Sequence, residues 1–423
     1  MTIQEAIAVL NDVPSFVEAT PESLAQFTHW IQSGLDSFLS VSLNEWVDSL
    51  LQISSHETKN QSSADERNVF FNENAGNTSY EEVRTILRGD LFRNYPFPPC
   101  NNPEFTFIDL FAGIGGFRIG MQDLQGKCVF SCEWDKNAQE TYFSNFGEYP
   151  FGDVHRFTSP DVSDDEIDRL IPDHDILCAG FPCQPFSRAG VSARNSLGLK
   201  SGFECETQGT LFFDIMRIAK VKRPEVLFLE NVKGLRSSDG GRTFSTIRKS
   251  VEEDLNYSFH YKIINSNTLV PQNRERCYIV CFKNRNVEFE FPSFNGAKKN
   301  LGSILEKNVS DEYTISDRLW KGHQERTKRN LNRGTGFTAF LADLSRPSNT
   351  LVARYGKDGK ECLIPQEGKN PRKLTPRECA RLQGFPETFI PAKSKTAAYR
   401  QFGNAVSVPV VKRIGEAILK TMR

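Results

Sequence analysis

The chain has 423 residues, of which 38% are hydrophobic and 25% are charged, as is ordinary for a soluble globular protein. No run of about eighteen apolar residues occurs, and the first residues (MTIQEAIAVLNDVP) lack the basic flank and apolar stretch of a signal peptide. We therefore expect a cytoplasmic protein of about two or three domains, without a membrane segment. Its ten cysteines are expected to be reduced and, in the absence of a C-x-x-C pair, to hold no metal.

The net charge of −1 hides an uneven distribution along the chain. Residues 1–100 carry 5 basic and 14 acidic side chains, a net charge of −9, and residues 101–282 carry 20 and 25, a net charge of −5. Residues 283–423 carry 27 basic and 14 acidic side chains, a net charge of +13. Because a polyanion responds to a local patch rather than to the whole-chain sum, nucleic acid is expected to bind the last third.

Apolar residues recur at helical spacing in the first hundred residues, which predicts a helical N-terminal extension (1–100) without a catalytic signature. The segment 94–103 (NYPFPPCNNP) cannot continue a helix and marks a domain boundary. Between residues 105 and 282, five strand-like runs alternate with helical segments: FTFIDLF, KCVFSCE, HDILCAG, EVLFLEN and CYIVCF. This alternation predicts an α/β domain (101–282) with a parallel, doubly wound sheet.

The alternation is lost in residues 283–374, a basic stretch with Gly and Asn that is expected to form a small irregular unit. A helix is predicted to begin after Thr375, where Thr-Pro-Arg-Glu combines an N-cap, Pro at the first helical position and Glu378 closing a capping box. Residues 375–423 therefore form a fourth segment, and no internal repeat is visible.

A candidate nucleotide site begins where the first strand ends, at a tight turn that lets a ligand approach the backbone and contains Gly113, Gly115 and Gly116. Glu133 ends the next strand, where a carboxylate can accept both hydroxyls of a ribose. Trp134 can cover an adenine ring, and Asp153 is a further polar candidate. Arg118 replaces the third glycine of the dinucleotide fingerprint, so these residues indicate a nucleoside cofactor without separating nicotinamide from S-adenosylmethionine.

A cysteine follows the third strand in a loop that two prolines make irregular and rigid. Cys183 lies at the carboxyl end of that strand, where ligands bind in open α/β sheets. Glu230 ends the next strand, and Arg274 and Arg276 precede the fifth; guanidinium groups bind carboxylate, phosphate or carbonyl oxygen. Each of these residues alone could be an ordinary surface residue in a salt bridge, but their common position at strand ends indicates one site.

Six ordered motifs make the chain resemble the cytosine-5 DNA methyltransferases: DLFAGIGG (109–116), GFPCQPFS (180–187), ENVKGL (230–235), QNRER (272–276), RLQGFP (381–386) and QFGNAV (401–406). The resemblance covers roughly residues 105–420 and is greatest to bacterial restriction-modification and orphan CC(A/T)GG-type enzymes. It implies an S-adenosylmethionine-dependent methyltransferase with a Rossmann-like sheet, acting on carbon 5 of a cytosine flipped out of duplex DNA. It also implies a monomer near the bacterial nucleoid, and it leaves open a cognate restriction endonuclease acting on the same site.

The resemblance also implies roles for individual residues. Cys183 is the nucleophile that adds to carbon 6, Glu230 protonates or hydrogen-bonds N3, and Arg276, with Arg274 beside it, holds O2. S-adenosylmethionine is expected to contact Phe111, Gly113, Gly115, Glu133, Trp134, Asp153, Pro182, Leu211, Asn404 and Val406. Because Asn404 comes from the far end of the chain, the final helix is expected to pack beside the first strand. The base that removes the carbon-5 proton is not identified.

DNA contacts are expected from two regions. Gln184 and Ser187 flank the nucleophile and would touch the DNA or the position that the flipped base vacates. Thr350, in the target-recognition region (283–374), resembles the residue that holds the backbone of the flipped nucleotide. A basic cluster in this region is expected to contact mainly phosphate, with a solvated basic surface as the alternative for each of Arg326, Arg329 and Arg333.

Other function classes stay open at this point. An RNA cytosine-5 methyltransferase would share the catalytic domain, but the long basic segment after Phe282 favours DNA. A non-catalytic DNA-binding protein on the same fold is disfavoured by the intact Cys183, Glu230 and Arg276. A nicotinamide dehydrogenase would have no use for the Pro-Cys-Gln loop. Residues 1–100 could be a packing module, a dimerisation surface or a regulatory arm.

Overall fold

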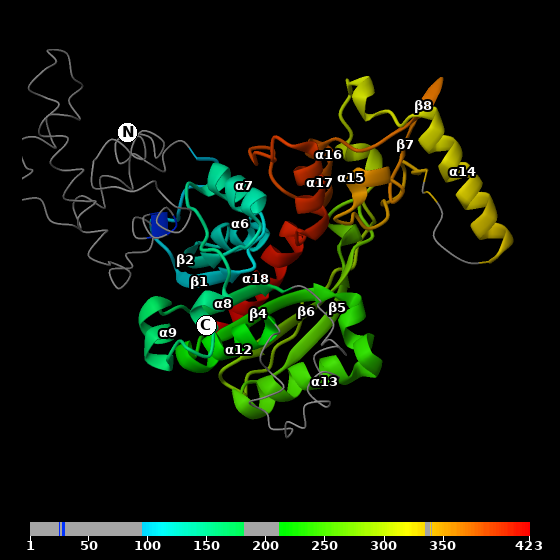
Figure 1. Cartoon of the computed structure of the whole chain (residues 1–423). Helices are drawn as coiled ribbons and strands as arrows, with labels where there is room; N and C mark the ends of the chain where they lie inside the picture. Colours follow the sequence, from blue (N-terminus) through cyan, green and yellow to red (C-terminus); the bar gives the residue numbers. More distant parts are fainter. Residues whose placement is uncertain (1–24, 26–27, 30–94, 182–210, 335–338, 340) are drawn as a thin grey trace, which may run out of the picture.

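A six-stranded sheet with the strand order β2-β1-β3-β4-β6-β5 lies at the centre of the molecule (Figure 1). The computed structural model describes residues 95–181, 211–334 and 341–423, and also Ala25, Thr28, His29 and Ala339. The strands are β1 (Phe105–Leu110), β2 (Gly126–Cys132), β3 (Ile176–Gly180), β4 (Val226–Val232), β5 (His260–Asn265) and β6 (Glu275–Phe282). All five strand-like runs expected from the sequence are confirmed as strands of this sheet.

The expectation of a parallel sheet is wrong for one of the six strands, β6, while β5 runs in the same direction as β1 to β4. Strands β1 to β4 pair in parallel, but β6 is antiparallel to both β4 and β5. Only the segment 266–274 joins β5 to β6, which is shorter than the crossover that a parallel pair needs, so the two strands form a hairpin-like antiparallel pair. Strand β5 escaped prediction because it is an edge strand whose side chains are mostly half-exposed and include His260 and Lys262.

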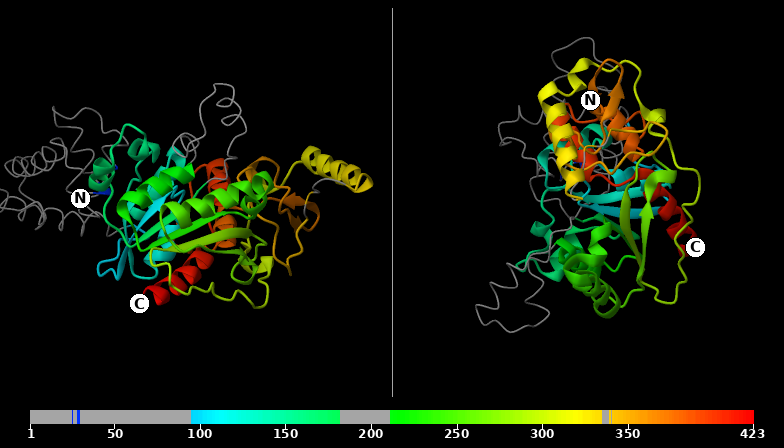
Figure 2. Two further views of the ribbon diagram at one scale, coloured as in Figure 1. Left: turned by 90° about the horizontal axis from the view of Figure 1, so that it is seen from below. Right: turned by 90° about the vertical axis from the view of Figure 1, so that its right-hand side faces the viewer.

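Helices cover both faces of the sheet, as a doubly wound fold requires (Figure 2). One face carries α6 (Gly116–Gln122) and α18 (Val408–Met422), whose apolar side chains share one buried cluster with Phe105 and Phe107 of β1. The expectation that the final helix packs beside the first strand is therefore confirmed. The other face packs against a second cluster and is covered by α8 (His155–Thr158), α9 (Asp164–Leu170), α12 (Leu211–Lys222) and α13 (Arg242–Lys249).

A third buried cluster lies at one end of the sheet, where α7 (Lys136–Phe146), α16 (Pro376–Gln383) and α17 (Lys395–Asn404) meet. The predicted start of α16 is confirmed, because the Thr375 hydroxyl accepts the Glu378 N–H at 3.1 Å and the Glu378 carboxylate accepts the Thr375 N–H at 2.8 Å. Within the described parts of the chain, no helix is both long and apolar enough to cross a membrane.

Residues 283–374 are less irregular than the sequence suggested. They contain the 16-residue helix α14 (Asp317–Asn332), the short α15 (Tyr355–Asp358), and a hairpin of β7 (Ile364–Gln366) and β8 (Lys369–Arg372). Helix α14 extends away from the sheet in Figures 1 and 2. Its mostly polar sequence gave no apolar stripe to reveal it, and it begins at a Ser316 cap, whose hydroxyl accepts the Leu319 N–H.

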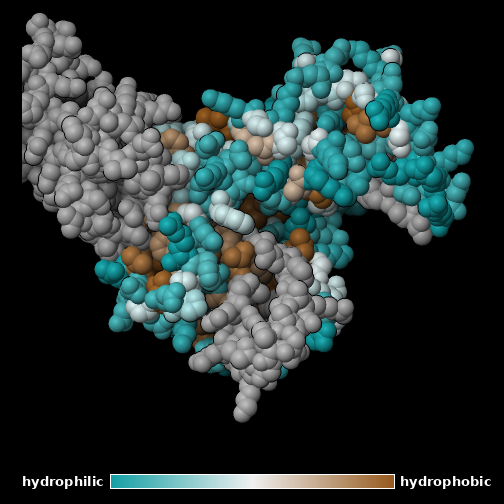
Figure 3. Space-filling model, in the orientation of Figure 1, coloured by the Kyte–Doolittle hydropathy of each residue, from teal (hydrophilic) through white to brown (hydrophobic). Residues whose placement is uncertain are grey.

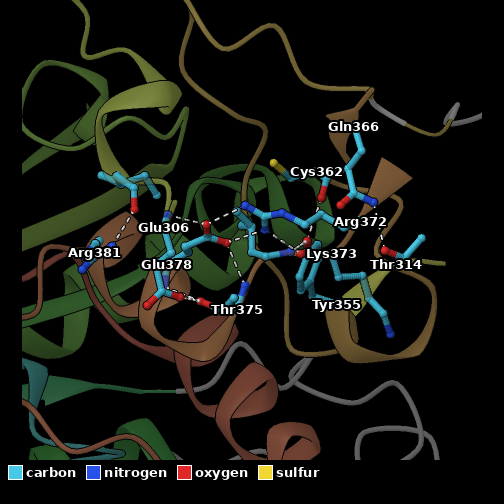
Figure 4. A network of polar contacts seen from close by, with 12 residues as sticks. Glu306, Thr314, Tyr355, Cys362, Gln366, Arg372, Lys373, Thr375, Glu378 and Arg381 are labelled. Carbon is cyan, nitrogen blue, oxygen red and sulfur yellow. Dashed lines mark hydrogen bonds and ion pairs between the residues drawn. The ribbon is translucent and has the colours of Figure 1, made fainter. Parts of the chain in front are cut away.

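A buried ion pair joins this hairpin to α16 (Figure 4). Arg372 contacts Glu378 through both terminal nitrogens, at 2.7 and 2.8 Å, and both side chains are almost fully buried. The same carboxylate accepts the N–H of Glu306 at 2.8 Å. Such a two-point contact fixes geometry as well as charge, so the Arg372–Glu378 pair sets the position of the hairpin relative to α16.

The described residues near the N-terminus dock on the edge strand β2. Ala25, Thr28 and His29 are helical and buried, and His29 Nε2 lies 3.1 Å from the Ser131 N–H and 2.9 Å from the Glu148 carboxylate. Burial disfavours ionisation of Glu148, but the charges of Arg118 and His29 outweigh it and lower its pKa to about 2. The rest of the predicted helical extension lies outside the described residues, so its helicity stays a prediction.

Candidate active site

The turn after β1 fixes a carboxylate at the carboxyl edge of the sheet. Both Gly113 (φ +57°) and Gly115 (φ +83°) have left-handed backbone, which favours glycine. The Gly113 N–H donates to Glu133 Oε2 at 2.7 Å, and the Asp135 N–H donates to Glu133 Oε1 at 2.7 Å. Burial raises the pKa of Glu133, while these two N–H groups oppose that rise. The carboxylate is thereby held at the strand end with free lone pairs for ligand hydroxyls.

The glycines of this turn differ in what surrounds them. A Cβ at Gly115 would lie 2.3 Å from Phe146 Cε2, and one at Gly116 would lie 2.7 Å from Val406 Cγ2. At Gly113 no described atom lies within 4 Å of that position. Close packing therefore explains two of the glycines, whereas the open side of Gly113 leaves room for a ligand against the backbone.

Arg118, which replaces the third fingerprint glycine, has a structural role. It is fully buried in α6, donates to the Tyr142 hydroxyl at 2.8 Å and pairs with Glu148 at 2.9 Å. At the position where the dinucleotide fingerprint has its third glycine, this chain therefore has an arginine in a buried ion pair. The side of the turn next to Gly113 stays open.

The other predicted donor contacts lie around this edge in different environments. Trp134 directly follows Glu133 and is 80% exposed, and Asp153 is exposed two residues after Phe151, which bridges in parallel to Cys132 of β2. Phe111 follows β1 with φ +58°. The remaining predicted contacts are Leu211, which begins α12 and is half-buried, and Asn404, which ends α17 and is exposed. Val406 follows α17 and is buried against Gly116. Together they offer an exposed ring, polar groups and a carboxylate, which fits a nucleoside.

The catalytic candidate Glu230 lies where β3 and β4 end. Gly180 of β3 pairs in register with Glu230 of β4, so the chain leaves β3 beside this carboxylate. Asn231 is buried and donates from Nδ2 to the Phe181 carbonyl at 2.9 Å, which anchors the start of the loop. The residues expected next in this loop, Pro182, Cys183, Gln184 and Ser187, lie outside the described residues.

Glu230 and Arg276 form a buried pair, with Arg276 Nε 3.1 Å from Glu230 Oε1. Glu230 is 7% exposed, and burial raises its pKa although the charges of Arg276 and Arg274 oppose the rise. Its Oε1 makes no well-formed hydrogen bond with the described residues. A carboxyl group with a raised pKa can donate a proton to a substrate atom, and the cation next to it can stabilise negative charge there.

The guanidinium group of Arg274 donates to backbone carbonyl groups and not to Glu230. Arg274 is 2% exposed, and its terminal nitrogens donate to the carbonyl groups of Leu351, Gly403 and Ala405. Burial first, and then the charge of Arg276, lower the pKa of Arg274 to about 9.

Gln272 is a site residue whose role the sequence did not reveal. It is fully buried, accepts the Leu351 N–H at 2.7 Å and donates to the Leu382 carbonyl at 3.0 Å. Thr350 contributes to the same cluster by donating from its hydroxyl to the Asn273 carbonyl at 2.6 Å. Its place in the motif QNRER was the only sign in the sequence that Gln272 belongs to the site, because its partners Leu351 and Leu382 are far away along the chain.

The predicted DNA-contacting arginines lie on α14 and at its end. Arg326, Arg329 and Arg333 are exposed and follow one another at intervals of three and four residues, which places them on one face of the helix. Arg326 lies 3.7 Å from Asp358. The surface of this part of the molecule is strongly hydrophilic (Figure 3). The structure therefore presents a basic strip, separate from the Glu230–Arg276 pair.

Comparison with known proteins identifies the family. Residues 105–420 match the family model for C-5 cytosine-specific DNA methylases, so the chain belongs to that family. The chain is 50% identical over 348 residues to the type II methyltransferase M.SsoII of Shigella sonnei, covering 81% of this chain and 86% of that one. It is 49% identical over 349 residues to the type II methyltransferase M1.ScrFI of Lactococcus lactis subsp. cremoris, covering 81% and 84%.

Solved structures agree in fold. The crystal structure of the S. pombe Dnmt2 methyltransferase matches with a TM-score of 0.58 at 19% identity, over 75% of this chain and 99% of that one. The predicted methyltransferase fold and family are therefore confirmed. The protein is a DNA (cytosine-5-)-methyltransferase, which confirms the prediction of DNA as the substrate and sets aside the RNA, non-catalytic and dehydrogenase alternatives. Enzymes of this family use S-adenosylmethionine as methyl donor.

Proposed function

We propose that this enzyme methylates one cytosine within a specific duplex sequence and serves as the protective half of a type II restriction-modification system. The buried Glu230–Arg276 pair, beside the strand end from which the cysteine loop departs, is the observation that carries the proposal. The similarity to two type II methyltransferases at about half identity supports the biological setting. A cognate endonuclease acting on the same site, a monomeric enzyme, and a place near the nucleoid in the cytoplasm belong to the same proposal.

The donor site is proposed at the turn after β1. Glu133 would accept the ribose hydroxyls, Trp134 would cover the adenine ring, and the open side of Gly113 would admit the rest of the molecule. Phe111, Gly115, Asp153, Pro182, Leu211, Asn404 and Val406 complete the proposed set. When bound, S-adenosylmethionine supplies a methyl group bonded to a sulfonium, which is electrophilic.

The target cytosine is proposed to enter the site after leaving the duplex, since its carbon 5 cannot be reached inside the stack. The Cys183 thiolate forms a bond to carbon 6, and Glu230 gives its proton to N3 while Arg276 holds O2. The charge that would otherwise build up on the ring is thereby neutralised, and carbon 5 becomes an enamine carbon able to attack a methyl group. A base then accepts the carbon-5 proton, the Cys183 thiolate is expelled, and N3 returns its proton to Glu230, which restores the neutral ring.

DNA is proposed to lie along α14. Arg326, Arg329 and Arg333 would contact phosphate groups, Thr350 would hold the backbone of the flipped nucleotide, and Gln184 and Ser187 would act beside the nucleophile. Replacing all three α14 arginines by Gln should reduce the slope of log affinity against log salt by roughly 2–3, at about 0.9 for each phosphate group that is no longer neutralised. An unchanged slope would exclude α14 from the DNA interface.

The decisive chemical test is covalent trapping on duplex DNA containing 5-fluorocytosine. Fluorine cannot be removed as a proton is, so the wild-type enzyme should remain attached through Cys183 after methyl transfer. Cys183→Ala should form no covalent complex and transfer no tritiated methyl group, yet still bind duplex DNA. Trapping by the Ala variant would refute the assigned nucleophile, and label found only in transfer RNA offered alongside would refute the substrate.

A further inference from the structure

One buried guanidinium holds two distant parts of the chain together. Arg274 precedes β6, and its Nη1 donates to the Leu351 carbonyl at 2.9 Å. Its Nη2 donates to the Gly403 carbonyl at 3.1 Å and to the Ala405 carbonyl at 2.7 Å. The first acceptor lies in the target-recognition region and the other two lie at the end of α17, so a single side chain bridges the two.

The acceptors are neighbours of residues proposed to bind the two substrates. Leu351 follows Thr350, the proposed contact to the flipped nucleotide, while Gly403 and Ala405 flank Asn404, a proposed donor contact. A shift of either segment would therefore lengthen hydrogen bonds to the same guanidinium. Both terminal nitrogens of Arg274 are engaged by these carbonyl groups, and only its buried Nε lacks a partner among the described residues.

Independent contacts show that the two segments form one packed unit. A Cβ at Gly403 would lie 2.3 Å from the backbone nitrogen of Ala353, so the two backbones touch directly. Gln272 accepts the Leu351 N–H at 2.7 Å, and the Thr350 hydroxyl donates to the Asn273 carbonyl at 2.6 Å. Gln272 and Asn273, which directly precede Arg274, are thus also bonded to the Thr350–Leu351 segment.

No ion pair among the described residues explains the burial of Arg274, although the charge of Glu230 acts on it as well as the charge of Arg276. Among the described residues, no carboxylate lies within ion-pair distance of its nitrogens, and the nearby Arg276 carries a like charge. Three carbonyl dipoles arranged around a planar fork are a geometry that arginine satisfies and lysine does not, because the donors of arginine are fixed in one plane. A positioning role explains this arrangement better than contact with a base.

We propose that Arg274 is a positioning residue that couples the donor site to the target-recognition region, so that binding of S-adenosylmethionine and of target DNA strengthen each other. This inference rests on the proposed function. By linkage, each ligand then changes the affinity of the other by the same factor, and that factor measures the coupling.

The test is a binding cycle on the full-length enzyme. The Kd of S-adenosylhomocysteine is measured by calorimetry with and without a duplex carrying the methylated site, for wild type, Arg274→Met and Arg274→Lys. The wild-type ratio is expected to be about 5- to 150-fold, the range typical of coupled sites. Arg274→Met should bring the ratio to within about twofold of one, and Arg274→Lys should restore part of it. The same loss should appear as raised KM values at a kcat that falls less.

Arg217 provides a matched control, because it also donates to three backbone carbonyl groups, those of Thr158, Ser159 and Val162, but all within one loop. Arg217→Met should lower thermal stability and leave the ratio at its wild-type value. If Arg274→Met does not fold, Thr350→Val removes one bond of the same cluster and should reduce the ratio as well. A ratio unchanged in a folded Arg274→Met protein, or equally reduced by Arg217→Met, would overturn the inference.

These outcomes are separate from failure of the proposed function. A wild-type enzyme that methylates no DNA would refute the proposed function itself. A wild-type enzyme that methylates DNA, but whose affinity for S-adenosylhomocysteine does not depend on DNA, would refute only the coupling through Arg274.

Discussion

Two glycines of the donor turn give a matched pair of substitutions. Gly113 and Gly115 both have positive φ, so alanine at either position costs about 1–2 kcal/mol of backbone strain. At Gly115 the added Cβ would also lie 2.3 Å from Phe146 Cε2. Phe146 is buried and lies under the Arg118 guanidinium, 4.7 Å from the ring centroid, so the ring has little room to move. Overpacking of this kind adds about 1–3 kcal/mol.

Gly115→Ala should therefore lower the free energy of unfolding by about 2–5 kcal/mol, and Gly113→Ala by only about 1–2 kcal/mol, as urea unfolding would measure. The order reverses for ligand binding. Because the Cβ at Gly113 enters the open space proposed for the donor, Gly113→Ala should weaken S-adenosylhomocysteine binding at least about tenfold, which corresponds to roughly 1.4 kcal/mol. Equal losses of stability would refute the role of Phe146, and undiminished affinity in Gly113→Ala would refute the position of the donor.

Three further predictions concern buried charged groups. Arg372→Met leaves Glu378 buried without its partner and should lower the free energy of unfolding by about 3–5 kcal/mol in urea titrations. Most of the loss should be recovered when Glu378→Gln is added, because glutamine removes the buried charge and keeps an oxygen that can accept the Thr375 or Glu306 N–H. Burial raises the pKa of Asp109 from 3.8 to about 8, so the folded protein binds this proton more tightly than the unfolded chain, and stability should fall as pH rises between about 4 and 8. Asp109→Asn should flatten the dependence of Tm on pH in that range, and an unaltered slope would contradict the buried neutral carboxyl. Glu230→Gln should lower kcat by about 10²–10⁴ without weakening donor binding. Because burial raises the pKa of Glu230, the activity of the wild type should fall at alkaline pH as Glu230 loses its proton, and this fall should be absent from the Gln variant.

Local patterns predicted much of the fold. The apolar runs revealed the strands that are buried on both faces, and the Thr375 capping box marked the start of α16 to the residue. Strand β5 and helix α14 were missed because half-exposed or mostly polar segments carry no apolar period. The direction of β6 depends on the short connection from β5, which pattern alone did not reveal.

The candidate site was predictable where a residue ends a strand, as Glu133 and Glu230 do, because parallel strands bring their carboxyl ends to one edge. The partners of Arg274 were not predictable, since its three acceptor carbonyls lie 77 to 131 residues away in the chain. The pairing of Arg118 with Glu148 was hidden for the same reason.

The most direct measurement of the central claim is methylation of random-sequence duplex DNA by the purified enzyme, followed by bisulfite sequencing. Cytosines protected from conversion should appear within one short sequence, and only when S-adenosylmethionine is supplied. Cys183→Ala should protect none. Full conversion of every cytosine after incubation with the active, donor-supplied enzyme would contradict the assignment of cytosine-5 methylation.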